Sequence, residues 1–145
     1  MAGGGPGTRL CGGEVALGER MYEAAVTDIE KAFDEGEILR THVMRPTWHF
    51  VAPQDIRELL ALTAPRVHAV NAQMYRKLEL NDDCLSRCRA VLRKALRGSN
   101  YLTRPELANR LLENNIEAAG QRLAYILMHA ELEALICSGR HAAGP

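Results

Sequence analysis

The chain has 145 residues, of which 47% are hydrophobic, and its 18 basic side chains balance its 18 acidic ones. This length fits one ordinary domain or two very small ones, and the apolar content is sufficient for a core. No apolar run reaches the about 20 residues of a membrane-spanning helix, and the start lacks the apolar segment of a signal peptide. We therefore expect a cytoplasmic protein, while the zero net charge neither favours nor excludes a polyanionic partner.

The first third of the chain predicts two helices. The glycine-rich residues 1–14 are expected to be disordered. A helix is expected over residues 15–24 and a second over residues 27–35, with Thr27 as its N-cap and Gly36 as its stop signal.

Residues 37–51 are typical of a half-buried β-hairpin. Apolar residues alternate there with arginine and histidine, and Arg45 and Pro46 supply the turn because proline fixes φ and cannot donate to a ladder. Trp48 and Phe50 are expected in the core and not as stacking platforms for bases. A helix followed by such a hairpin is the plan of a winged helix, so this segment points towards nucleic acid.

The rest of the chain predicts helices. Pro53 is placed in the first turn of a helix that Pro65 breaks or restarts, and the restarted helix carries Val70 inward. A later helix is capped by Asn81 or Asp82 and ends before Gly98. Thr103 begins a capping box for a helix whose apolar side is Leu107, Leu111 and Leu112, and a third helix runs from residues 118–120 to Leu135. Residues 136–138 start to resemble a strand.

These elements predict a mainly α fold with a small β-hairpin. We expect a winged-helix remnant over residues 15–64, a linker helix over 65–80, a tri-helical helix-turn-helix core over 81–139 and a disordered tail over 140–145. The strand at 136–138 would open a wing that the chain does not complete. This incompleteness suggests a fragment of a longer protein or a shortened relative.

Three groups of polar side chains are candidate DNA contacts. Arginine forks bind phosphate oxygens bidentately, and glutamine and arginine near the start of a recognition helix reach base edges. The alternatives are solvated helix and strand faces, or packing of the last helix against a neighbouring domain, because Glu131 and Glu133 repel phosphate. The candidates are Arg40, His42, Arg45, Thr47 and His49 on the hairpin; Arg89, Arg93, Arg97 and Arg104 on the middle helices; and Gln121, Arg122 and Tyr125 on the last helix.

No cofactor or metal site is expected. Cys84 and Cys88 lack the spacing of a zinc site and have no second ligand pair, so we interpret them as reduced thiols. The sequence GGGPG lacks the lysine and the strand–helix context of a phosphate-binding loop.

The run LRTHVMRPTWHFVAPQDIRELLALTAPRV resembles the signature R-T-x-x-x-R-G-T-x-H-x-V-x-x-x-D of winged helix DNA-binding domain-containing proteins. Some members of this bacterial family are AlkZ-like DNA glycosylases, which release alkylated or cross-linked bases. The later segments TRPELANRLLE and AELEALICSG also resemble the family, so the likeness covers roughly residues 24–139. The residues that fall on the signature are Arg40, Thr41, Arg45, Thr47, His49, Val51 and Asp55.

Two features differ from the family pattern. Pro46 stands where the family has glycine, and residues 1–28 contain nothing like the catalytic Gln-x-Gln segment, since the first glutamine is Gln54. The resemblance therefore implies a winged-helix protein that contacts double-stranded DNA mainly through its phosphates. A DNA-repair glycosylase, or a fragment of one, is the alternative, and a winged-helix protein-interaction module is the second.

Overall fold

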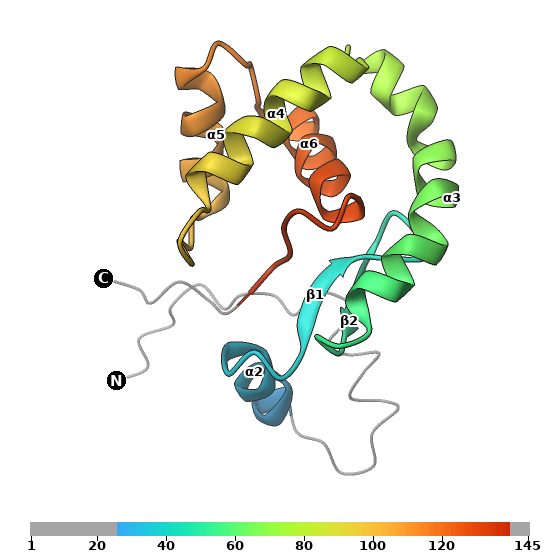
Figure 1. Ribbon diagram of the computed structural model, residues 1–145, viewed down its shortest axis with the longest axis vertical. Coiled ribbons are helices and arrows are strands. Elements are labelled where there is room, and N and C mark those ends of the chain that lie inside the picture. The colour runs from blue at the N-terminus through green and yellow to red at the C-terminus, as the bar shows by residue number, and fades with distance from the viewer. Residues whose placement is uncertain (1–25, 140–145) are drawn as a thin grey trace, which may run out of the picture.

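The computed structural model describes residues 26–139, and within them the fold is mainly helical with one small antiparallel sheet (Figure 1). This confirms the predicted fold class. The predicted helix over 15–24 and the two ends expected to be disordered lie outside the described residues. No helix among those described is long and apolar enough to cross a membrane. The elements are α2 (Val26–Asp34), β1 (Leu39–His42), β2 (Trp48–Val51), α3 (Ile56–Lys77), α4 (Asp82–Ala95), α5 (Arg104–Glu113) and α6 (Gly120–Leu132).

The hairpin is confirmed at its predicted place. Its strands pair antiparallel, with Leu39 opposite Val51 and His42 opposite Trp48. The preceding helix α2 begins at Val26, so Thr27 lies inside the helix and the prediction that it is the N-cap was wrong. Gly36 follows the helix with a φ of 77°, the left-handed conformation of a helix stop signal.

Two predictions about the prolines near helix α3 were wrong. Pro53 lies in the turn before the helix, and Pro65 lies inside a helix that continues unbroken from Ile56 to Lys77. Proline removes one backbone hydrogen bond from a helix. Here Ala64 and Val67 are buried on either side of it, so packing against the core holds both halves in one helix. Residues 64 and 65, which the sequence assigned to different units, are consecutive residues of α3.

The caps of the next two helices are confirmed. The Asn81 side chain accepts a hydrogen bond from the Cys84 backbone N–H at 2.8 Å, which fixes the start of α4. Thr103 and Glu106 form the capping box of α5. Helix α6 ends at Leu132, three residues before the predicted end.

Helix α6 is shared by two hydrophobic clusters. The first joins α4, α5 and α6 around Leu92, Leu111 and Ile126. The second joins the hairpin, α3 and the end of α6 around Val43 and Val67. Figure 1 shows α6 between α4 and α3, which agrees with this double role.

Two apolar residues that were expected inside are exposed. Val70 on α3 is 62% exposed and Leu112 on α5 is 63% exposed, because the neighbouring helices cover only a narrower face of each.

The segment after α6 pairs with the hairpin strand β1. Arg40 and Ser138 exchange two backbone hydrogen bonds, N–H to O at 3.3 Å and 2.8 Å, as an isolated antiparallel bridge. Of the strand-like residues 136–138, Ser138 therefore pairs with the edge of β1, where the sequence had suggested the start of a second wing. The reason is that the free edge of β1 offers unpaired backbone groups close to the end of α6.

Candidate nucleic-acid interface

Two of the hairpin candidates are engaged within the fold. The Arg40 guanidinium lies over the rings of Trp48 and Phe33, with centroid distances of 4.8 and 5.5 Å. His42 is 8% exposed, and its Nδ1 forms a hydrogen bond with a carboxylate oxygen of the buried Glu131. Both side chains therefore stabilise the contact between the hairpin and the elements that cover it.

The hairpin turn carries Arg45 and Thr47, and the third remaining candidate, His49, lies on β2. Arg45 and Thr47 are exposed, while the half-buried His49 directs its Nδ1 to the Thr47 carbonyl at 3.0 Å. The turn is held against α3, because the Met44 N–H donates to Thr63 Oγ1 at 3.2 Å. Of this group, Arg45 and Thr47 are available to a ligand in solution.

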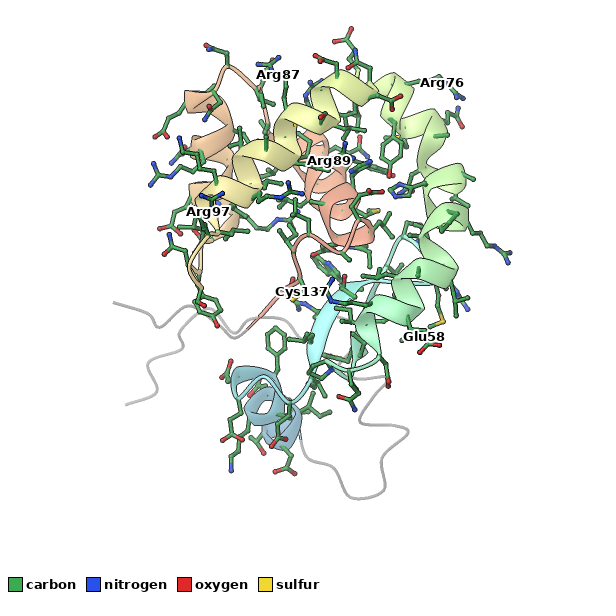
Figure 2. The ribbon with its side chains drawn as sticks, in the orientation of Figure 1. Glu58, Arg76, Arg87, Arg89, Arg97 and Cys137 are labelled. Atoms are coloured by element: carbon green, nitrogen blue, oxygen red, sulfur yellow. The ribbon has the colours of Figure 1, made fainter. Side chains whose placement is uncertain are left out.

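The three arginine candidates in this part of the chain divide into one paired and two exposed side chains; Arg89 and Arg93 lie on α4, and Arg97 lies two residues after the end of α4 at Ala95. Arg89 is half-buried and lies 3.8 Å from a carboxylate oxygen of Glu133. Arg93 and Arg97 are exposed, and within residues 26–139 neither makes an ion pair or side-chain hydrogen bond. Figure 2 shows Arg97 at the end of α4 that is remote from α3.

Arg104 connects α5 to the hairpin. It is the first residue of α5, is exposed, and places its guanidinium 5.7 Å from the centroid of the Trp48 ring. Arg93, Arg97 and Arg104 are together called the α4–α5 basic surface below.

Arg122 is anchored at the first turn of α6. Its guanidinium donates to the carbonyls of Glu117 and Leu78 and approaches Cys84 Sγ at 3.4 Å. It therefore fixes the start of α6 against the α3–α4 connection.

Most of α6 is buried, which limits what this helix can contact. Tyr125 packs edge-on against Tyr75 at 6.2 Å, and every residue from 126 to 132 is buried. Gln121 is the exposed member of the three candidates on this helix. Only the first turn of α6 is thus open to a partner, and this is the part of a recognition helix that contacts base edges.

One polar cluster was not found from the sequence. His68 of α3, His129 of α6 and Glu133 lie together beside a pocket of about 580 Å³, whose lining includes His68, Tyr75 and His129. His68 and Glu133 are 65 residues apart, so no local spacing signals the cluster. Only the packing of α3 on α6 brings it together.

The comparisons with known proteins gave one match. The family model described as DNA glycosylase AlkZ-like matches residues 12–145. Searches of curated proteins and of solved structures found no significant match.

Proposed function

The chain belongs to the AlkZ-like DNA glycosylase family, and on this premise we propose that it contacts duplex DNA through backbone phosphates at the α4–α5 basic surface. Arginine side chains on such a surface neutralise phosphates and release condensed counterions, which is the main source of affinity for DNA backbone. Arg45 and Thr47 of the hairpin turn and Gln121 of α6 are exposed further contacts in this proposal.

The observation that carries the proposal is the state of Arg93 and Arg97. They are four residues apart, with Arg93 on α4 and Arg97 two residues after its end; both are exposed, and neither is neutralised by a carboxylate within residues 26–139. By contrast, Arg89 and Arg122 are occupied within the fold. An arginine that already has partners must lose them before it binds phosphate, whereas Arg93 and Arg97 lose only water.

Salt-dependent binding tests the proposal. The Arg93→Ala/Arg97→Ala double variant removes two phosphate contacts, so the slope of log K against log salt concentration should become shallower by about 1.8. Fluorescence anisotropy of a labelled duplex measures this slope. The matched control is Arg57→Ala/Arg66→Ala, which removes two exposed arginines from α3.

Two results would contradict the proposal. The wild-type chain failing to bind duplex DNA at low salt would remove DNA binding altogether and would favour a protein-interaction module. An equal change of slope in the α3 control would show that the contact is not at the α4–α5 basic surface.

The second candidate function is base excision, which the family name favours. In that case the chain takes part in releasing an alkylated base from duplex DNA, and the basic surface holds the duplex. Release of a labelled alkylated base from a duplex by the wild-type chain tests it. Binding without any release of base would leave DNA binding as the function of this chain.

A further inference from the structure

Three potential ligand atoms gather where α3 packs against the end of α6. One atom each from His68, His129 and Glu133 lies within 4.8 Å of the other two. His68 Nε2 lies 3.1 Å from Glu133 Oε1. His129 is 8% exposed, and within residues 26–139 neither of its ring nitrogens has a hydrogen-bond partner. Its ring lies 4.8 Å from that of His68, centroid to centroid.

We propose that His68, His129 and Glu133 bind one divalent transition-metal ion of the zinc type. Two imidazoles and one carboxylate form a ligand set that zinc uses when a fourth position is left open. A point equidistant from three atoms 4.8 Å apart lies about 2.8 Å from each, and zinc ligands lie about 2.1 Å from the metal. Each ligand atom therefore moves by about 0.7 Å or less, which is a side-chain adjustment and not a change of fold.

The neighbours of His68 favour the required tautomer. The Tyr75 hydroxyl lies 2.9 Å from His68 Nδ1, and when Nδ1–H donates to this hydroxyl, Nε2 faces the cluster with a free electron pair. Such a partner on the second ring nitrogen orients most metal-binding histidines. Burial raises the pKa of Tyr75, so its oxygen stays a neutral hydroxyl.

The charges around the cluster also favour a cation. Glu133 and Asp82 contribute two negative charges and Arg89 one positive charge, which leaves one net negative charge. Arg89 approaches Oε2 of Glu133, the oxygen that does not face His68.

The adjoining pocket gives the ion access and an open coordination position. His68 and His129 both line the pocket of about 580 Å³, together with Asp82 and Asn81. Water, or a ligand that enters the pocket, completes the coordination sphere.

A metal-free hydrogen-bond network is the competing explanation. His68 Nε2–H then donates to Glu133 while the Tyr75 hydroxyl donates to Nδ1. Glu133→Gln separates the two explanations, because glutamine keeps an acceptor oxygen for His68 but loses the charge that a metal requires. Glu133 is an exposed residue, so this change does not disturb the core.

Calorimetric titration of the metal-free full chain with Zn²⁺ is the test. We expect one equivalent to bind to the wild type, with affinity reduced at least tenfold by Glu133→Gln and by His68→Gln. The matched controls are Glu58→Gln and His49→Gln, which should bind like the wild type. Glu58 lies ten residues before His68 on α3, about 15 Å along the helix, and Figure 2 shows it near the end of α3 opposite Arg76.

Cobalt(II) spectroscopy distinguishes binding at the proposed site from binding to thiols. This control is needed because Cys84, Cys88 and Cys137 are free. A site of nitrogen and oxygen ligands gives visible d–d bands without the thiolate-to-cobalt charge-transfer band. No binding of Zn²⁺ by the wild type, unchanged affinity in Glu133→Gln and His68→Gln, or a thiolate band at one equivalent of cobalt would each overturn the proposal. This site and its test are independent of DNA binding.

Discussion

His42 and Glu131 form a buried polar contact between the hairpin and α6. They are 8% and 5% exposed, and His42 Nδ1 meets a carboxylate oxygen of Glu131. A buried carboxylate and imidazole are tolerated only as partners, since each alone would be desolvated without compensation. The contact joins residues that are 89 positions apart and holds β1 against the central helix.

Removal of one partner should therefore be costly. We expect Glu131→Ala to lower the free energy of unfolding by at least about 3 kcal/mol, because His42 remains buried without its acceptor. Urea denaturation followed by circular dichroism measures the change. Glu117→Ala, at an exposed position, should change the stability by less than about 0.5 kcal/mol. A similar small effect for Glu131→Ala would contradict the structural role of the pair.

Single residues also show that the sequence does not predict the tertiary partners of a side chain. The sequence indicated Arg40 and Arg122 as candidate DNA contacts, but their surroundings come from distant parts of the chain. Arg40 lies on the Phe33 ring and pairs through its backbone with Ser138, and Arg122 donates to the Leu78 carbonyl 44 residues away. Whether an arginine faces solvent or the fold depends on such tertiary partners, and no local pattern encodes them.

At the scale of elements, the N-terminal caps of α4 and α5 were predictable, whereas the predicted N-cap of α2 was wrong. The capping box of α5 was evident from the sequence because Thr103 and Glu106 are three residues apart and interact locally. The continuity of α3 through Pro65 was not evident, because it depends on the burial of Ala64 and Val67 against other elements. The capping signals of α4 and α5 were therefore read correctly from local sequence, whereas the effect of a proline in a helix depends on tertiary packing.

The capping box also predicts a pH dependence of stability. Hydrogen bonds from the backbone and side chain of Thr103 lower the pKa of Glu106, so its charged form is favoured in the folded state. Because the folded pKa is depressed, this stabilisation is present above the unfolded pKa of about 4.5 and is lost as the pH falls through the folded pKa. We expect the wild type to melt at a higher temperature than Glu106→Gln at pH 7, and the difference to vanish at a pH below the folded pKa.

Thermal melts across this pH range measure the difference. The control is Glu113→Gln, at the other end of α5. A difference in melting temperature between wild type and Glu106→Gln that stays constant from pH 7 to below the folded pKa would contradict the role of the carboxylate.

At the scale of the whole molecule, we expect α6 to make the described part of the chain one cooperative unit. Its early and central residues complete the cluster with α4 and α5, and Met128 and Leu132 complete the cluster with α3 and the hairpin. The return of Ser138 to Arg40 adds a backbone connection between the same two parts.

A core substitution far from the hairpin tests this cooperativity. Leu111→Ala truncates a fully buried side chain in the α4–α5–α6 cluster and should cost about 2–5 kcal/mol. Trp48, the single tryptophan, reports on the hairpin by fluorescence, while circular dichroism reports on the helices. If α6 couples the two clusters, both probes should shift to the same lower urea midpoint in Leu111→Ala.

A fluorescence midpoint that stays at its wild-type value while the circular dichroism midpoint falls would show that the hairpin unfolds independently. Exposed Leu112→Ala is the neighbouring control and should move neither probe by more than a small amount.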